Sequence, residues 1–207
     1  LRLKSTLALW LARMNQDHLY VNLEAFPSYF LKSEPGDKNL SDIFYHIKAA
    51  KGNLAIALES TVCNGSGGIC HIPPMDNPGD LWELNDGENR ILAETLLYWG
   101  RFSTIIADIE FNTSPRTLQW LEMASHVLVP FTAGYPDPIL RMKSMLSSLP
   151  VAGTDKYRWV LCGADYHESL KDEFESLHSL PWLQELPQRF GALNPEKHAL
   201  EQLKALL

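Results

Sequence analysis

The chain has 207 residues, 45% of them hydrophobic, which suits one large α/β domain or one domain with a small addition. Its 18 Lys and Arg residues stand against 25 Asp and Glu, and the resulting net charge of −7 disfavours direct binding to nucleic acid. No apolar run reaches the roughly 18 residues of a membrane-spanning helix, so the sequence predicts a soluble, cytoplasmic protein.

The three cysteines, Cys63, Cys70 and Cys162, cannot all pair within one chain, and their spacing fits no zinc site. Reduced thiols are the expectation for a cytoplasmic protein. Cys63 and Cys70 flank a glycine-rich turn, which leaves a contact between these two open. The seven histidines are scattered without the paired spacing of a metal site.

In the first half of the chain, helical apolar periodicity alternates with short apolar runs. We expect a helix over Thr6–Met14, a strand over Leu19–Leu23, a loop over residues 25–39, helices over Ser41–Lys48 and Leu54–Glu59, a strand over Ile69–Ile72, a loop over residues 73–79 and a turn or helix over Asp80–Leu84.

The second half continues the same alternation. We expect helices over Glu88–Trp99, Pro115–Ala124, Pro138–Leu149 and His167–Leu180, strands over Ser103–Asp108, His126–Pro130 and Tyr157–Cys162, and a closing helix capped by Asn194. This order predicts right-handed crossovers and an α/β fold with a mostly parallel twisted sheet flanked by helices. The residues expected to be buried in central strands are Val21, Ile105, Ile106, Val127, Val129, Val160 and Leu161.

Four segments carry a more specific pattern. Lys4-Ser5-Thr6 opens an apolar helix, the strand after it ends at Glu24, Ile69–Leu81 combines a strand with a proline-rich loop, and a second buried strand ends at Asp108. In order and spacing these segments, with the strand Val127–Phe131 after them, resemble the MinD/ParA group of P-loop ATPases, particularly its CpaE-like and related clostridial-type members. The resemblance covers most of the chain.

The resemblance implies a three-layer P-loop NTPase-like fold and one MinD/ParA-like α/β domain over residues 1–207, with its first strand or a receiver-like domain upstream of Leu1. It also implies ATP and Mg²⁺ as cofactors. In this family the Lys neutralises β and γ phosphate oxygens, the first hydroxyl binds Mg²⁺ and the helix N-terminus faces the phosphates. By resemblance Lys4, Ser5 and Thr6 bind the nucleotide, and Ser5 and Asp108 hold the metal. Glu24 would then lie near the catalytic acid that activates water.

The phosphate loop departs from the family pattern. Leu1, Arg2 and Leu3 stand where a working loop needs glycines that bring bare backbone N–H groups to phosphate. The resemblance places the Leu3 side chain in the phosphate space, which predicts a degenerate Walker A loop. Three further departures are Asn22 in place of an acid, Ile109–Asn112 in place of the family's switch turn, and Cys162 where an adenine-reading Asn is often found.

Local explanations of the same residues stay open. Ser5 and Thr6 also suit the start of any helix, and Asp108 also suits a turn after a strand. Two functions therefore compete: a degenerate or weak ATPase-type regulatory or localisation module, which needs no cofactor, and an active Mg-ATP-dependent dimerising switch. A small-molecule enzyme on another doubly wound scaffold has no catalytic constellation to support it. For the first two we expect a protein partner or a homodimer, and an indirect association with a membrane or a cell pole.

Overall fold

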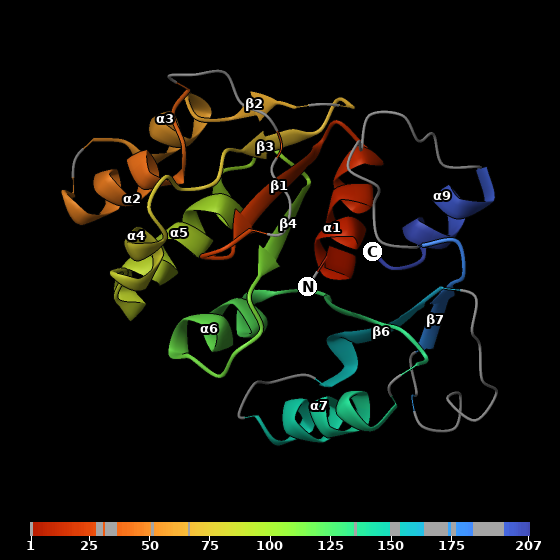
Figure 1. Cartoon of the computed structure of the whole chain (residues 1–207). Coiled ribbons are helices and arrows are strands. Elements are labelled where there is room, and N and C mark those ends of the chain that lie inside the picture. Colours follow the sequence, from red (N-terminus) through yellow and green to blue (C-terminus); the bar gives the residue numbers. More distant parts are fainter. Residues whose placement is uncertain are drawn as a thin grey trace. The chain divides into compact units, whose positions relative to one another are not determined.

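The structure, a computed structural model, describes residues 2–27, 31, 37–50, 52–65, 67–134, 136–149, 154–163, 174, 177–183 and 197–207. The chain divides into two compact units, residues 1–120 and residues 121–207. Each unit contains one sheet (Figure 1).

The first unit contains a sheet of four strands with the order β2-β3-β1-β4. Strand β1 pairs in parallel with β3 and β4, and only the short β2 is antiparallel to its neighbour β3. In chain order the elements are α1 (Arg2–Arg13), β1 (His18–Leu23), α2 (Leu40–Lys48), α3 (Leu54–Glu59), β2 (Cys63–Asn64), β3 (Cys70–Ile72), α4 (Pro78–Trp82), α5 (Asp86–Tyr98), β4 (Thr104–Ile109) and most of α6 (Pro115–Met123).

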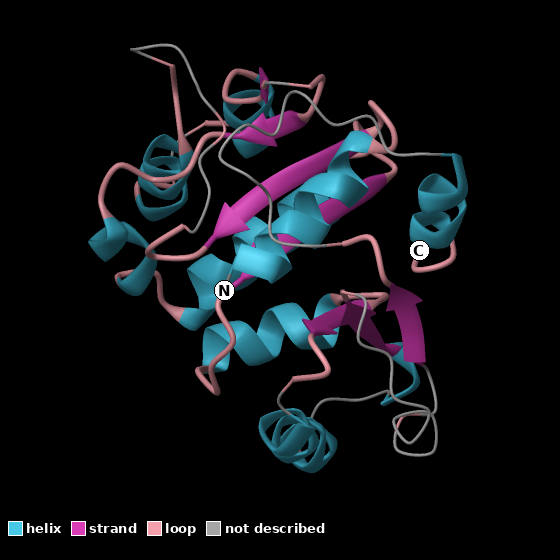
Figure 2. Cartoon of the chain, turned by 45° about the vertical axis from the view of Figure 1, so that its right-hand side comes forward, coloured by secondary structure: helices cyan, strands magenta, loops and turns pink. Residues whose placement is uncertain are grey.

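Helix α1 and strand β1 form the centre of this unit. All six residues of β1 are buried, and α1 packs along β1 and β4, as Figure 2 also shows. The core side of α1 includes Leu7 and Leu11, which lie one helical turn apart and are almost fully buried. This packing fixes the first turns of α1 against the carboxyl ends of β1 and β4.

Asparagine side chains set the start of two helices. Asn39 and Asp42 form a reciprocal capping box at α2, and Asn85 and Glu88 form another at α5. Because Asn85 is the cap, α5 begins two residues before the predicted Glu88. The predicted start of the first helix at Thr6 is also wrong, since α1 is already helical at Arg2.

The second unit contains three parallel strands in the order β5-β6-β7. Its elements are β5 (Val127–Phe131), α7 (Pro136–Ser148), the short 3₁₀ helix η1 (Thr154–Lys156), β6 (Tyr157–Cys162), β7 (Leu177–Leu180) and α9 (Lys197–Lys204). Aromatic rings pack beside the middle strand: Trp159 and Phe174 have centroids 4.8 Å apart, and Phe131 lies 5.4 Å from Phe174.

The predicted fold class, an α/β fold with mostly parallel strands flanked by helices, is confirmed. The predicted helix over His167–Leu180 is wrong at its end, because residues 177–180 pair with β6 as strand β7. The rest of that segment and the Asn194 cap lie outside the described residues. Ile105, Val127 and Val129 are half-buried rather than buried, since β4 and β5 stand at the ends of the two strand orders. The single domain over residues 1–207 stays a prediction.

All three cysteines are free thiols. The antiparallel register places Cys63 opposite His71 and Asn64 opposite Cys70. Since successive side chains of a strand point to opposite faces, Cys63 and Cys70 lie on different faces of the ladder. Within the described parts of the chain, no helix is long and apolar enough to cross a membrane.

Candidate functional site

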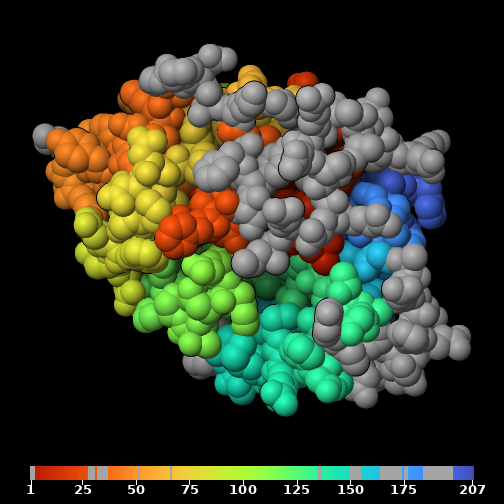
Figure 3. Space-filling view, viewed as in Figure 1, coloured from red at the N-terminus to blue at the C-terminus, as the bar shows by residue number. Residues whose placement is uncertain are grey.

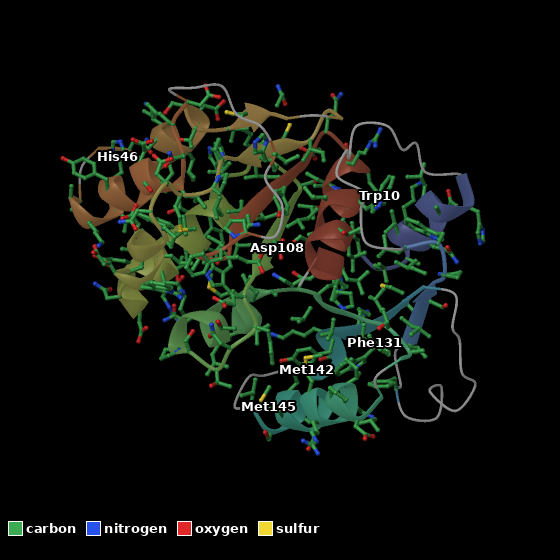
Figure 4. The ribbon with its side chains drawn as sticks, in the orientation of Figure 1. Trp10, His46, Asp108, Phe131, Met142 and Met145 are labelled. Carbon is green, nitrogen blue, oxygen red and sulfur yellow. The ribbon has the colours of Figure 1, made fainter. Side chains whose placement is uncertain are left out.

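The carboxyl ends of β1 and β4 bring polar side chains together. In the parallel register Asn22 stands opposite Asp108, and Glu24 follows directly after β1. Tyr20 lies two residues before Asn22 and therefore on the same face of the strand. Figure 4 shows Asp108 at the carboxyl end of β4, beside α1. All four side chains are buried despite being polar.

Lys4 connects this edge of the sheet to α1. Its ammonium nitrogen Nζ lies 2.8 Å from Oε1 of Glu24 and 2.5 Å from Oδ1 of Asp108, and it also donates to the Ile109 carbonyl at 2.7 Å. A lysine ammonium has three donors, and three acceptors surround it here. The Lys4 side chain is 25% exposed, whereas those of Glu24 and Asp108 are 3% and 0% exposed.

Tyr20 and Asn22 extend the hydrogen-bond network from Asp108 to the backbone of Glu24. The Tyr20 hydroxyl donates to Oδ2 of Asp108 at 3.0 Å, and the Asn22 amide donates to the Tyr20 hydroxyl at 3.0 Å. The backbone N–H of Glu24 donates to Oδ1 of Asn22 at 2.9 Å. Burial, followed by the negative charge of Asp108, raises the pKa of Tyr20 well above its ordinary value. Tyr20 is therefore a permanent donor to Asp108.

We refer to Lys4, Ser5, Tyr20, Asn22, Glu24 and Asp108 together as the Lys4 cluster. Ser5 is buried, and its hydroxyl lies 3.5 Å from Oε2 of Glu24, at the long limit of a hydrogen bond. Thr6 is buried in the same turn of α1. The structure thus brings Lys4, Ser5, Glu24 and Asp108 together, while their roles toward a nucleotide stay predictions.

Tyr20 is the member that the sequence analysis missed. Tyr20, Asn22 and Glu24 occur at every second position, a spacing that places three polar side chains on one face of an otherwise apolar strand. That alternation was the available signal. The carbonyl of Ile109, which also binds Lys4, leaves no trace in the sequence, because every residue has a carbonyl.

The donor atoms of the cluster suit a hard cation only in part. One ammonium against two carboxylates leaves a formal charge of −1, and hydroxyl and carboxylate oxygens are the ligands that Mg²⁺ prefers. However, both acids already bind Lys4. Within the described residues, no three His, Cys, Asp or Glu side chains gather as a metal site.

The described backbone at the start of α1 is helical from Arg2 onward. An anion-binding nest needs a residue in the left-handed region, but among the described residues before Ala50 none has a positive φ. Residues 1–35 contain no glycine. A cavity lined in part by Leu23, Ile109 and Arg116 has a volume of about 10 Å³, which is room for one water.

No protein-family model matches the sequence, and no curated protein sequence matches it. Solved structures do match. A ParA-family ATPase from Chlorobium tepidum has a TM-score of 0.61 at 14% identity, over 86% of this chain and 76% of that chain. The septum site-determining protein MinD from Pyrococcus horikoshii, complexed with Mg-ADP, has a TM-score of 0.61 at 13% identity. This match covers 98% of this chain and 87% of that chain.

A plasmid partition protein from Borrelia burgdorferi, bound to AMPPNP, gives a TM-score of 0.59 at 14% identity, over 98% of this chain and 90% of that chain. At such identities the likeness concerns the fold. The chain therefore has the fold of MinD/ParA-type P-loop ATPases.

Proposed function

We propose that this chain is a regulatory or localisation module of the MinD/ParA type, close to the CpaE-like members, in which the phosphate site is degenerate and nucleotide binds weakly or not at all. It works in the cytoplasm through a protein partner or a second copy of itself, and any association with a membrane or a cell pole is made through that partner. The observation that supports this is the Lys4 ammonium, whose donors are taken by Glu24, Asp108 and the Ile109 carbonyl.

Two costs weaken nucleotide binding at such a site. A phosphate would have to replace two carboxylates that are already within hydrogen-bonding distance of Lys4. It would also lack the backbone donors of a glycine nest, and hydrogen bonds to charged groups contribute about 1.5–3 kcal/mol each. Losing several of them converts the micromolar affinity of a working site into millimolar affinity or none.

An active dimerising switch is the second candidate. Lys4, Ser5, Glu24 and Asp108 gather at the carboxyl edge of parallel strands, and this is the edge where open α/β sheets bind their ligands. In this alternative, Lys4 would pair with the phosphates of the nucleotide, and Ser5 and Asp108 would hold Mg²⁺, which would neutralise phosphate charge. The two candidates share the same residues and differ in whether Lys4 leaves its two acids.

Titration calorimetry with Mg-ATP separates the two functions. The wild-type chain should bind with millimolar affinity or not at all, and Mg-ATP should shift the melting temperature of neither the wild type nor Asp108→Asn. Asp17→Asn is the matched control, because Asp17 is exposed and precedes the opposite end of β1. Micromolar binding that Asp108→Asn abolishes and Asp17→Asn preserves would establish the active switch in place of the degenerate module.

A further inference from the structure

Two large aromatic side chains of the first unit are exposed and touch each other. Phe26, shortly after β1, is 73% exposed, and Trp82, the last residue of α4, is 58% exposed. Their rings meet edge to face with centroids 6.0 Å apart. In Figure 3 the orange-red segment after β1 lies at the surface beside the yellow α4. Paired aromatic rings in water are unusual, because tryptophan generally packs on apolar faces.

The short helix that carries Trp82 is held in place at both ends. Helix α4 has only five residues, with Pro78 at its first turn and the Asn77 side chain accepting a hydrogen bond from the Gly79 N–H at 2.9 Å. At its other end Leu81 is buried, and the guanidinium of Arg116 donates to the Leu81 carbonyl. Trp82 is thus presented from an ordered turn, which lowers the entropy lost when it binds a partner.

Acidic residues surround this helix in the sequence. The segment of residues 75–89 contains five carboxylates and no Lys or Arg, namely Asp76, Asp80, Glu83, Asp86 and Glu88. Among the described residues, Glu83 is the only one of these five whose carboxylate pairs with a basic side chain. Its Oε2 lies 2.7 Å from Nζ of Lys48 on an exposed surface. Exposed pairs of this kind contribute little and exchange readily. Three cations lie beside this segment, namely Lys48, which pairs with Glu83, Arg90, which follows it in the sequence, and Arg116, which binds the Leu81 carbonyl, so the five carboxylates leave a smaller net negative charge around the aromatic pair.

We propose that the Phe26–Trp82 surface docks a basic amphipathic segment of a protein partner, with its apolar side chains against the two rings and its Lys and Arg side chains toward the carboxylates of residues 76–88. The inference deepens the proposed function, since it supplies the partner surface of a regulatory module. Tryptophan is enriched among the residues that dominate binding energy, and a cation over its ring adds further attraction.

Charge complementarity selects this occupant. A second copy of the chain would place the same acidic segment opposite itself at a net charge of −7 per chain, and like charges oppose such an encounter. An anionic membrane surface would be repelled for the same reason. A segment with both basic and apolar side chains gains attraction to the carboxylates and apolar contact with the two rings.

The experiment uses the full chain and a fluorescein-labelled designed peptide, about five helical turns long, with leucine on one face and lysine on the other. Fluorescence anisotropy at physiological ionic strength should give micromolar affinity. Trp82→Ala should weaken binding about tenfold or more, and Phe26→Ala should weaken it in the same direction. Tyr98→Ala is the matched control, because Tyr98 is 83% exposed on α5 and should not matter.

A second peptide, with glutamate in place of every lysine, tests the charge argument and should bind far more weakly. All variants should keep the wild-type circular dichroism spectrum and melting temperature, since the changed side chains are exposed. Equal binding of the two peptides, or equal losses in Trp82→Ala and Tyr98→Ala, would overturn the proposal. So would Trp82-dependent dimerisation in sedimentation experiments, or Trp82-dependent binding to vesicles of anionic lipid.

The titrations are run without nucleotide and repeated with Mg-ATP. Micromolar binding of Mg-ATP, together with peptide binding that still depends on Trp82, would refute the degenerate site and support the docking surface. Absence of nucleotide binding, together with peptide binding that ignores Trp82, would refute the docking surface alone. The two proposals therefore fail in different measurements.

Discussion

Strands β1 and β6 are both inner strands of their sheets, yet most of their buried side chains differ in kind. In β1 all six residues are buried, and three of them, His18, Tyr20 and Asn22, are polar. In β6 the consecutive buried residues from Trp159 to Cys162 have aromatic, aliphatic and thiol side chains. Apolar burial is enough to form an inner parallel strand, so the polar residues of β1 need another explanation.

The polar residues of β1 are tolerated because each has a hydrogen-bond partner. A ring nitrogen of His18, Nδ1, lies 2.7 Å from the Leu11 carbonyl, while Tyr20 and Asn22 belong to the Lys4 cluster. Fully satisfied buried networks specify one arrangement, whereas a half-satisfied network destabilises the fold. The difference between the two strands is that β1 carries a buried polar network, whereas the buried residues of β6 from Trp159 to Cys162 make packing contacts.

The largest expected effect is a loss of folding stability, and it tests the packing role of the apolar strand β6. Trp159→Ala should lower the free energy of unfolding of the second unit by about 3–5 kcal/mol, since it empties a packed aromatic site. Urea unfolding, followed by both circular dichroism and fluorescence because the chain has two compact units, measures the loss. Trp82→Ala is the control and should change stability by less than about 0.5 kcal/mol, because Trp82 is exposed. A similar loss in both variants would contradict the packing role of β6.

The next effect tests the polar strand. Lys4→Met removes the cation from two buried acids and should cost about 3 kcal/mol, the lower end of the range for breaking a buried pair, because Lys4 is 25% exposed. The same urea titration measures it. Lys204→Met is the matched control, since its pair with Glu201 is exposed on both sides. If the two lysine variants unfold alike, the Lys4 cluster contributes no more than a surface pair.

A smaller effect separates charge from packing within the cluster. Combining Lys4→Met with Glu24→Gln and Asp108→Asn should restore roughly half or more of the lost stability, because no unpaired charge is left buried. The comparison of single and triple variants measures the recovery as a coupling energy. A triple variant that is less stable than Lys4→Met alone would show that the carboxylates stabilise the fold through hydrogen bonds rather than through Lys4.

Much of the fold could be predicted from the alternation of apolar runs, because burial and helical periodicity are local signals. Strand β7 could not: Leu177 and Leu180 have the spacing of a helix, and only pairing with β6 makes them a strand. Strand β2 has two residues, too few to leave a periodic pattern. Local patterns therefore predicted the elements but not the pairings that override them.

At the site, sequence reasoning identified Lys4, Glu24 and Asp108 as neighbours through the family resemblance. It did not predict that Lys4 would contact both acids, since these contacts join positions 20 and 104 residues apart. The side-chain geometry that decides between a nucleotide site and an internal ion pair is a tertiary property. For this reason the resemblance could suggest the residues while leaving their function open.

The smallest expected effect is on the pH dependence of stability. It is tested by comparing one histidine in each sheet, His71 and His178. Burial lowers the pKa of His71 in β3 and outweighs the backbone hydrogen bonds and Asp37, which raise it. Burial and then Arg158 lower the pKa of His178 in β7. The Nε2 atom of His71 is buried without a hydrogen-bond partner, whereas His178 is half-exposed. The first sheet should therefore be the more sensitive of the two to acid.

The sign follows from the direction of these shifts. A histidine whose pKa is lower in the folded than in the unfolded chain stays neutral on folding, so its contribution is fully present above pH 6.5, the ordinary value. Stability then falls as the pH decreases from 6.5 toward the folded pKa, by at most about 1.4 kcal/mol per pH unit for one proton. Urea midpoints measured between pH 8 and pH 5 should show a smaller slope for His71→Gln than for the wild type, because the amide does not titrate. His178→Gln should change the slope less, and a slope that is the same in the wild type and His71→Gln would show that acid acts through other groups.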